Sequence, residues 1–258
     1  MPEGDTVYLS AKNLNKALAG QVVTRFDLRV PAFATLDLTG EVIEGVASRG
    51  KHLLMRIGDF SIHSHLKMEG SWHLYREGTS WQRPEWQARA IIGTAEHTAV
   101  GFQLGTLEVL ERANEEDAVG HLGPDLLGPG WDAAEAKRRL LQHPETPVFI
   151  AVLEQRNLAG LGNEYANDLL FLRGLAPTRP IGEVDVDGLT SLAYRLIHAN
   201  KDRAIRSTTG DLRPKKTSWV YGRVGQPCRR CGTTILTTQL GPIPTIQRDV
   251  YWCPACQT

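Results

Sequence analysis

Residues 228–256 read CRRC-GTTILTTQLGPIPTIQRDVYW-CPAC, two Cys-x2-Cys pairs separated by 21 residues near the end of a 258-residue chain. Each pair forms a tight turn that can place two thiolates on one metal ion, and two pairs complete a tetrahedron. The segments 233–240 and 249–252 resemble the two strands of a ribbon between these turns. We therefore predict one structural Zn²⁺ ion bound by Cys228, Cys231, Cys253 and Cys256, with no open position for catalysis.

Such cysteines could instead form two disulfides or a redox pair, and the rest of the sequence bears on both alternatives. Hydrophobic residues make up 41% and charged residues 22% of the chain, as in ordinary globular proteins. No apolar run approaches the roughly 18 residues that span a membrane, and no secretory signal is visible, so we expect a cytoplasmic protein. That compartment disfavours two disulfides, and the absence of a surrounding βαβ pattern disfavours a redox pair.

The charge is distributed unevenly although the net charge is zero. Residues 201–258 hold ten Lys and Arg against three acidic residues, a net charge of +7, and residues 1–200 carry −7. This basic segment predicts either a face that binds a polyanion or a solvated charged loop, and charge alone does not decide between them. Arg248, between the cysteine pairs, either binds a phosphate or is an ordinary surface arginine.

Helical patterns precede the cysteine segment. We predict helices over 131–142, 146–156, 163–174 and 186–200, with Asp132 as an N-cap. The Gly-rich turn at 157–163 joins two of them, as in helix–turn–helix motifs. The stretch 120–130 holds four Gly and two Pro and is the predicted hinge to the preceding domain.

The first half of the chain has the pattern of a β domain. A helix is predicted over 3–19, before short apolar runs between residues 22 and 110 that are punctuated by glycine. This pattern predicts an antiparallel sandwich or flattened barrel. The fold class is therefore α+β and multidomain: a β-sandwich domain over 1–122, a helical domain over 131–226 and a zinc ribbon over 227–258.

The N-terminus offers a nucleophile. The chain begins Met1-Pro2-Glu3-Gly4, and a small second residue permits removal of the initiator Met. Pro2 would then carry a secondary amine with a pKa of about 8 or somewhat higher, which can attack a sugar carbon and form an imine. Glu3 could shuttle protons beside it. Taken alone the signal is weak, because many proteins have Pro second.

Several motifs occur together: the Met-Pro-Glu-Gly start, Ser48-Arg-Gly-Lys51 in the β domain, Gly160-Leu-Gly-Asn163 between helices, and the terminal ribbon with Gln247-Arg248. In this combination the chain closely resembles the Fpg/Nei family of DNA glycosylases over its whole length, and its endonuclease VIII (Nei) branch, in an actinobacterial form. The resemblance implies a β sandwich preceded by a helix, a helix–two-turn–helix domain and a zinc ribbon. It also implies a monomeric glycosylase and AP lyase that flips a damaged nucleotide out of double-stranded DNA.

The resemblance also implies roles for individual residues. Pro2 corresponds to the nucleophile on C1′ of the lesion's sugar, and Glu3 to the general acid/base. Lys51 corresponds to a lysine that holds a phosphate and assists elimination. Asn163 corresponds to the phosphate-binding asparagine of the helix–two-turn–helix motif, and Arg248 to the ribbon arginine that grips the phosphate near the lesion.

A wedge must fill the gap left by a flipped base. The stretch His65–Gly70 matches the family's wedge loop, with Met68 as the inserting residue, because an unbranched side chain adapts to a void. Apart from the resemblance, Met68 would be interpreted as a core residue. Glu69 is an acid in this loop that would lie close to DNA.

Other positions depart from the family's pattern. Thr6 occupies the position of a second N-terminal carboxylate, although Asp5 is adjacent. The segment Ala99–Leu107 lacks the Pro-Arg-Arg-Phe-Gly loop of the 8-oxoguanine-type branch, which favours oxidised pyrimidines as substrates. An 8-oxoguanine-type glycosylase and a non-catalytic zinc-ribbon protein that binds damaged DNA are the alternatives.

Two further segments lead to structural predictions. His63 and His65 should point to one face of a strand, where a core or surface role is favoured over a metal site. Residues 206–223 are basic and rich in turn residues, and the resemblance implies a loop that closes over the flipped base. We expect this segment to be mobile without DNA.

Overall fold

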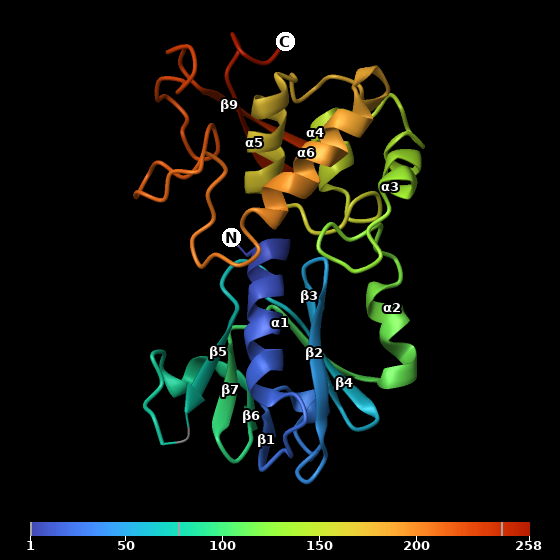
Figure 1. The fold of residues 1–258 in the computed structure, drawn as a ribbon, viewed down its shortest axis with the longest axis vertical. Helices are drawn as coiled ribbons and strands as arrows, with labels where there is room; N and C mark the ends of the chain where they lie inside the picture. The colour runs from blue at the N-terminus through green and yellow to red at the C-terminus, as the bar shows by residue number, and fades with distance from the viewer. Residues whose placement is uncertain (1, 77, 244) are drawn as a thin grey trace. The chain divides into compact units, whose positions relative to one another are not determined.

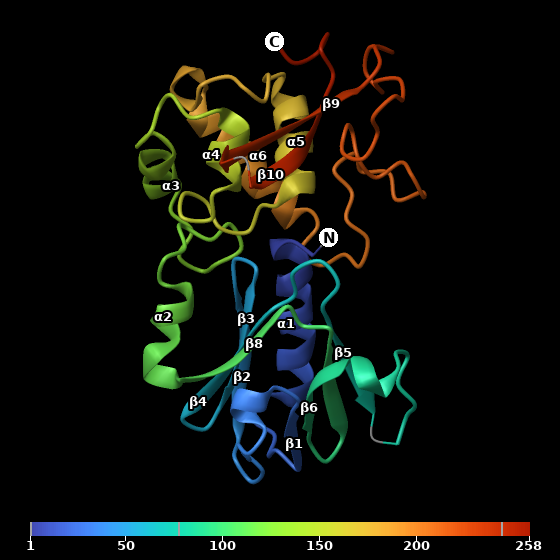
Figure 2. The same ribbon diagram turned by 180° about the vertical axis from the view of Figure 1, so that it is seen from behind.

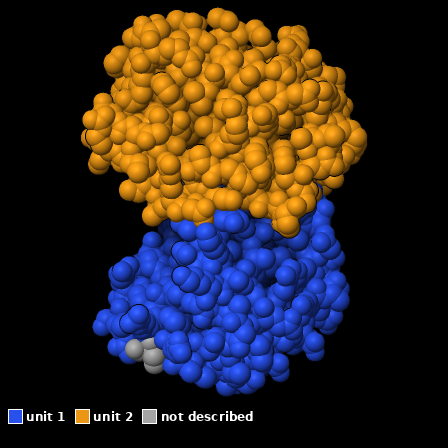
Figure 3. Space-filling view, in the orientation of Figure 1, with its two compact units in different colours: residues 1–121 blue, residues 122–258 orange. Residues whose placement is uncertain are grey.

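The computed structural model describes residues 2–76, 78–243 and 245–258. It divides into two compact units, Met1–His121 and Leu122–Thr258, which are coloured separately in Figure 3. The boundary falls inside the predicted hinge at 120–130. The division into three domains at 1–122, 131–226 and 227–258 stays a prediction. Among the helices of the described residues, none is long and apolar enough to cross a membrane.

Unit 1 is a β sandwich of two four-stranded antiparallel sheets (Figure 1). One sheet has the order β1-β6-β7-β5, formed by Arg25–Leu28 (β1), Ala88–Gly93 (β6), His97–Phe102 (β7) and Ser71–Arg76 (β5). The other has the order β2-β3-β4-β8, formed by Ile43–Arg49 (β2), His52–Ile57 (β3), Phe60–His65 (β4) and Thr106–Glu111 (β8). The predicted sandwich is confirmed, and the Gly58-Asp59 pair forms the turn between β3 and β4.

Helix α1 (Gly4–Leu18) packs on β2, β3 and β7. Its buried apolar residues recur at helical spacing and join the core between the sheets, and they are Val7, Ala11, Leu14 and Leu18. The chain reverses at Gly20, which has a φ of +81° that glycine adopts without strain. The predicted N-terminal helix is thus present, and it fixes the position of Pro2 and Glu3 relative to the sandwich.

Two elements of unit 1 were not foreseen. Strand β5 has the sequence SWHLYR, whose two aromatic residues and histidine hide the alternation on which strand prediction depends. Helix α2 (Glu115–Val119) is one short turn after β8, with three acidic residues in its first turn. Short 3-10 turns complete the chain at Pro31–Phe33 (η1), Glu85–Gln87 (η2), Arg112–Asn114 (η3) and, in unit 2, Ile181–Glu183 (η4).

Unit 2 joins four helices to a two-stranded ribbon (Figure 2). The elements are Ala133–Leu140 (α3), Val148–Leu153 (α4), Asn163–Arg173 (α5), Val186–His198 (α6), Leu236–Ile243 (β9) and Ile246–Trp252 (β10). Asp132 caps α3 as predicted, accepting hydrogen bonds from the backbone N–H groups of Ala134 and Glu135 at 2.9 and 3.0 Å. All four predicted helices are present.

The core of unit 2 is continuous from the helices into the ribbon. Val250 of β10 is fully buried with Tyr165, Leu169 and other residues of the helices. Gly241 of β9 lies so close to β10 that a Cβ atom would meet the Ile246 carbonyl oxygen at 1.7 Å, so only glycine fits there. The ribbon is therefore held against α5 in a fixed register.

Candidate functional site

The N-terminal residues lie at the start of α1. Pro2 is half-buried, and Glu3, the N-cap residue, has a completely buried side chain. Asp5 is also buried, and its Oδ1 accepts the backbone N–H of Thr6 at 2.8 Å. The helix start thus carries two buried carboxylates beside Pro2, and Asp5 is directed to the helix backbone. The expected removal of Met1 lies outside the described residues.

Lys51 lies in the tight turn between β2 and β3. Arg49 and His52 are the last paired residues, and Gly50 has a φ of +58° that permits the turn. Lys51 itself is half-buried. The turn places an ammonium group at the same end of the sheet at which β4 ends, because β3 and β4 pair from His52 to His65.

The predicted wedge loop is a single turn after β4. Leu66 is buried and anchors the loop, and the Gly70 N–H donates to the Leu66 carbonyl oxygen at 2.9 Å. Met68 is 63% exposed, so its interpretation as a core residue is wrong. An exposed apolar side chain at the tip of an anchored turn is the arrangement that insertion into a base stack requires.

A second short turn lies beside this loop. Residues 103–105 join β7 to β8, and a Cβ atom on Gly105 would meet the Lys67 Cγ atom at 2.2 Å. Arg83 donates to the Gln103 side-chain oxygen at 2.9 Å. No segment as long as the Pro-Arg-Arg-Phe-Gly loop fits between β7 and β8, because only three residues connect them.

Asn163 and Arg248 come close to each other in unit 2. Asn163 is the first residue of α5, and its Nδ2 donates to the Asp249 carbonyl oxygen at 3.0 Å. Asn167, one turn later, accepts the Tyr251 N–H at 2.6 Å. Arg248 is exposed, and its guanidinium contacts only its neighbour's carbonyl oxygen among the described residues, at 3.2 Å. The start of α5 is thus bound to the ribbon backbone next to Arg248.

The four cysteines form one cluster. Their sulfur atoms all lie within 4.8 Å of one another, with 4.0 Å between Cys228 and Cys256 and 3.4 Å between Cys231 and Cys253. These separations exceed a disulfide bond of about 2 Å. They match the roughly 3.8 Å that a tetrahedron of Zn–S bonds of about 2.3 Å requires. The cluster therefore fits a bound zinc ion.

The thiols differ in acidity when no ion is bound among them. Hydrogen bonds from Thr233 lower the pKa of Cys231 to about 6, whereas burial raises the pKa of Cys256 to about 12. Four thiolates this close repel one another unless a positive ion is bound among them. Within the described residues, no other group of three or more His, Cys, Asp and Glu side chains brings its ligand atoms close enough together to hold a metal ion.

Asp168 of α5 is a buried anchor that the sequence pattern did not reveal. Its carboxylate accepts the N–H groups of Trp219, Val220 and Tyr221 at 2.9, 2.8 and 3.1 Å, as well as the Thr208 hydroxyl. Burial raises the pKa of Asp168, and these hydrogen bonds oppose that shift. Both ends of the predicted mobile segment 206–223 are thus bound to α5. Its mobility without DNA stays a prediction.

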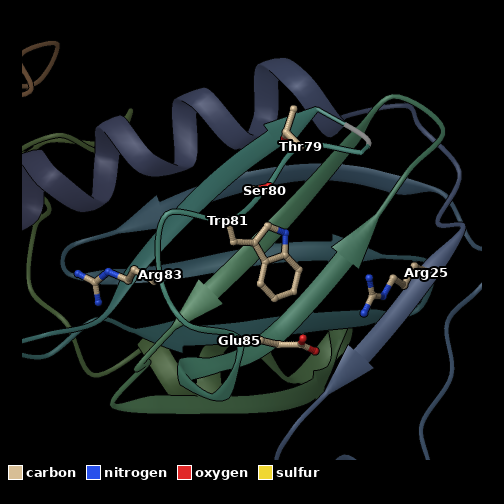
Figure 4. A pocket seen from close by; sticks show the side chains of 6 residues that line it. All are labelled: Arg25, Thr79, Ser80, Trp81, Arg83 and Glu85. Carbon is tan, nitrogen blue, oxygen red and sulfur yellow. The ribbon is translucent and has the colours of Figure 1, made fainter.

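A hollow of about 400 Å³ opens on the outer side of the β1-β6-β7-β5 sheet. Figure 4 shows Trp81 in its centre, with Arg25 and Glu85 beside it. Glu85 forms an ion pair with Arg29 at 2.8 Å. None of the residues singled out from the sequence lines this hollow.

Comparison with known proteins agrees with this architecture. The family model of the formamidopyrimidine-DNA glycosylase N-terminal domain matches residues 1–113, and that of the zinc finger found in FPG and IleRS matches residues 225–258. The fold is that of Lactococcus lactis Fpg, solved in complex with DNA containing an abasic site, with a TM-score of 0.80 and 23% identity over 100% of both chains.

Curated relatives extend the similarity along the whole chain. The probable endonuclease 8 2 of Streptomyces coelicolor is 50% identical over 262 residues, covering 100% of this chain and 94% of the relative. The DNA-(apurinic or apyrimidinic site) lyase Nei2 of Mycolicibacterium smegmatis is 48% identical over 259 residues, covering 100% and 99%. With an N-terminal sandwich, a helical unit and a cysteine ribbon in the same order, this chain belongs to the Fpg/Nei family of DNA glycosylases, in its endonuclease VIII branch.

Proposed function

We propose that this protein is a bifunctional DNA glycosylase and AP lyase of base excision repair, acting on oxidised bases in double-stranded DNA. The observation that carries the proposal is the pair Pro2-Glu3 at the start of α1, where the Glu3 carboxyl is completely buried. Relatives at 48–50% identity over the whole chain are named as endonuclease 8 2 and as a lyase of abasic sites. A buried carboxyl beside a secondary amine is suited to general acid–base catalysis on a sugar.

The chemistry follows from a free Pro2 amine. Its lone pair attacks C1′ of the damaged nucleoside, the bond from C1′ to the base breaks, and the base leaves with a proton. Glu3 donates a proton to the ring oxygen, so that the sugar opens and Pro2 forms an iminium ion. Loss of the proton on C2′ then expels the 3′ phosphate, and a second elimination expels the 5′ phosphate. Water finally hydrolyses the imine and releases Pro2.

Three residues are proposed to hold the phosphates around the flipped nucleotide. Lys51 supplies an ammonium group from the β2–β3 turn, and Arg248 supplies a guanidinium group from the ribbon. Asn163 contributes the N-terminal end of α5, where backbone N–H groups favour an anion. Met68 is the proposed wedge, and its exposure of 63% is compatible with insertion.

Oxidised pyrimidines are the proposed substrates. The three-residue turn 103–105 carries no arginine, so it lacks the donors that probe the base opposite an 8-oxoguanine lesion in the other branch. A loss of opposite-base contacts predicts a broader tolerance for the base across from the lesion.

The cysteine cluster is proposed to bind one structural zinc ion, which would supply stability to the ribbon and no chemistry to the reaction. The protein is proposed to act as a monomer in the cytoplasm, on nucleoid DNA. Its zero net charge makes the local basic groups, rather than the whole surface, responsible for DNA binding.

Borohydride trapping tests this function. The untagged protein with Met1 removed is incubated with duplex DNA containing one abasic site, and the reduced adduct is mapped by mass spectrometry. An adduct on Pro2 that disappears when Met1 is retained supports the lyase, and Glu3→Gln should slow its formation while the exposed Glu41→Gln control does not. No adduct, despite confirmed Met1 removal and bound zinc, would instead favour a non-catalytic protein that binds damaged DNA.

A further inference from the structure

A chain of hydrogen bonds crosses the outer face of the β2-β3-β4-β8 sheet. Glu108 of β8 lies 2.6 Å from the Nδ1 atom of His63 on β4, and the Nε2 atom of His63 lies 2.8 Å from the Nδ1 atom of His52 on β3. The strand register accounts for this alignment, because His63 pairs with Glu108 on one side and with Leu54 on the other. His63 is 3% exposed, whereas the Glu108 side chain is 41% exposed.

These contacts assign the tautomers of both histidines. An ionised carboxylate only accepts hydrogen bonds, so the Nδ1 atom of His63 donates to Glu108. A neutral imidazole has one N–H group, so the Nε2 atom of His63 accepts and the Nδ1 atom of His52 donates. The Nε2 atom of His52 is therefore left with a lone pair, and among the described residues it takes part in no hydrogen bond.

The surroundings of His52 are basic. Its ring stacks on that of His63 and meets those of His65 and His121 edge-on, with ring centroids 5.0, 5.0 and 6.1 Å away. Burial, followed by the charges of His65, His63, His121 and Lys67, lowers the pKa of His52 to about 3. Burial and the charges of Lys67 and Lys51 lower the pKa of His65 to about 4. In the free protein both imidazoles are thus neutral near pH 7.

The cluster adjoins the proposed phosphate-binding turn: His52 follows Lys51, and the charge of Lys51 acts on His65, whose ring meets that of His52. We propose that Glu108, His63 and His52 form a hydrogen-bonded charge relay and that His52 takes up a proton from the solvent when a DNA phosphate binds beside Lys51. His52 would then be a further positioning residue: its positive charge supports the anion bound to Lys51, and Glu108 balances that charge through His63. The inference rests on the proposed function, which places a phosphate at Lys51.

The proton balance is simple. A proton from the buffer acid binds the Nε2 atom of His52 and gives an imidazolium ion and the buffer base, while the Nδ1–H group stays in its hydrogen bond to His63. A nearby anion raises the pKa of a histidine by about 1–3 units. Starting from about 3, the pKa of His52 in the complex would reach about 4 to 6. Proton uptake should therefore be partial near pH 5.5 and close to zero at pH 7.5.

Calorimetry measures this uptake directly. Binding of duplex DNA that carries an uncleavable abasic-site analogue is titrated at pH 5.5 and 7.5, in buffers with different ionisation enthalpies. For a rise in pKa of about two to three units, we expect the wild type to take up roughly 0.2 to 0.7 proton more per complex at pH 5.5 than at pH 7.5. We expect His52→Asn to lose most of this difference, although the asparagine amide still donates a hydrogen bond to His63.

Three further variants separate the relay from a structural role. Glu108→Gln keeps an acceptor for His63 but removes the balancing charge, so its uptake at pH 5.5 should fall. Glu111→Gln removes the same charge from the same strand outside the relay, and His143→Asn removes an exposed histidine of unit 2; both should keep the wild-type uptake. Melting curves at pH 5.5 verify that each variant is folded.

The outcomes are distinct. Wild-type uptake in His52→Asn would overturn the relay, because the proton would then bind elsewhere, for example on His65. Equal loss in Glu108→Gln and Glu111→Gln would also overturn it, because the effect would then be one of general charge. A failure of borohydride trapping with the uptake intact would remove the enzymatic proposal without removing the relay, since the titration uses binding alone.

Discussion

The side-chain amide of Asn163 donates a hydrogen bond of 3.0 Å to the carbonyl oxygen of Asp249, the residue that follows Arg248 on the ribbon. Asn167 strengthens this connection, because its Oδ1 accepts the Tyr251 N–H at 2.6 Å. Two residues far apart in sequence that are both proposed to bind phosphate thus depend on one contact between α5 and β10. The backbone next to Arg248 is therefore bound by the helix as well as by the neighbouring strand.

We expect Asn167→Ala to weaken DNA binding although Asn167 itself is not proposed to touch DNA. The substitution leaves the Tyr251 N–H without its acceptor and should lower the free energy of unfolding by about 1–3 kcal/mol. Displacement of β10 should weaken binding to abasic-site DNA several-fold, measured by fluorescence anisotropy. Gln239→Ala is the matched control, since Gln239 contacts Asp249 from the exposed face of β9 and its loss should leave binding unchanged.

Zinc removal should unfold the ribbon selectively. Few apolar residues support the cysteine turns, and those buried around them are Phe171, Val220 and Ile235. A metal ion would therefore supply much of the folding free energy of this segment. We expect about one zinc ion per chain by atomic emission, and we expect Cys231→Ser to reduce DNA affinity more than tenfold. The helix content of unit 2 should change little in the same variant, and a global loss of helix would contradict this view.

The fold was predictable because its periodic patterns are strong. The sequence predicts helices with apolar residues at regular spacing, such as α1. It also predicts strands that are bounded by glycine, such as β3. Strand β5 and helix α2 are harder to recognise, because the aromatic residues and histidine of β5 hide its alternation and α2 is too short to show a period. Gly101 is one of the glycines between residues 22 and 110, yet it lies within β7, where a Cβ atom would meet Leu104 and Trp72.

The predicted site residues came from resemblance rather than from pattern, and the structure adds the residues that support them. Asn167 and Asp168 are buried polar side chains on α5, and each has a hydrogen-bond partner 40 or more residues away. No local pattern reveals such pairs, since long-range contacts are created only by the fold. The relay of Glu108, His63 and His52 is hidden for the same reason, although the period of β4 placed His63 and His65 on one face.

Hydrogen exchange should divide the 206–223 segment into two classes of amide. We expect the amides of Trp219, Val220 and Tyr221 to be protected, because each donates to the Asp168 carboxylate, and residues 210–216 to exchange quickly. Asp168→Ala should abolish that protection and destabilise unit 2 by about 2–4 kcal/mol, since three backbone donors lose their acceptor. Asp168→Asn retains one acceptor oxygen and should preserve part of the protection.

Acid should destabilise the β sandwich before other parts of the chain. The pKa of His52 is about 3 and that of His65 about 4 in the folded protein, below the value of about 6.5 expected after unfolding. The unfolded chain therefore binds more protons between these values, and stability that is present above pH 6.5 is lost as the pH falls toward 4. Each histidine contributes up to about 1.4 kcal/mol per pH unit.

Native-state hydrogen exchange of the β3 and β4 amides between pH 7 and 4.5 would measure this loss. His65→Asn should reduce the slope, whereas His143→Asn, at an exposed position, should not. The wedge loop should respond as well, because the His65 Nδ1 atom accepts the Lys67 N–H at 2.9 Å and protonation of that atom breaks the bond. A slope that is the same in wild type and His65→Asn would contradict the assignment.

Met68→Ala should reduce the glycosylase rate on duplex DNA without affecting the stability of the free protein. Met68 is 63% exposed in the free protein, so its truncation leaves no cavity. In a base stack the side chain would be desolvated, and burial of a methionine contributes about 1.5–3 kcal/mol, which corresponds to a loss of roughly ten- to a hundredfold in kcat/KM.

Single-strand substrates have no stack to fill, so cleavage of an abasic site in a single strand should change little. Trp86→Ala removes an exposed apolar side chain from the same unit and serves as the control. Equal losses on both substrates would show that Met68 acts in the catalytic steps rather than as a wedge.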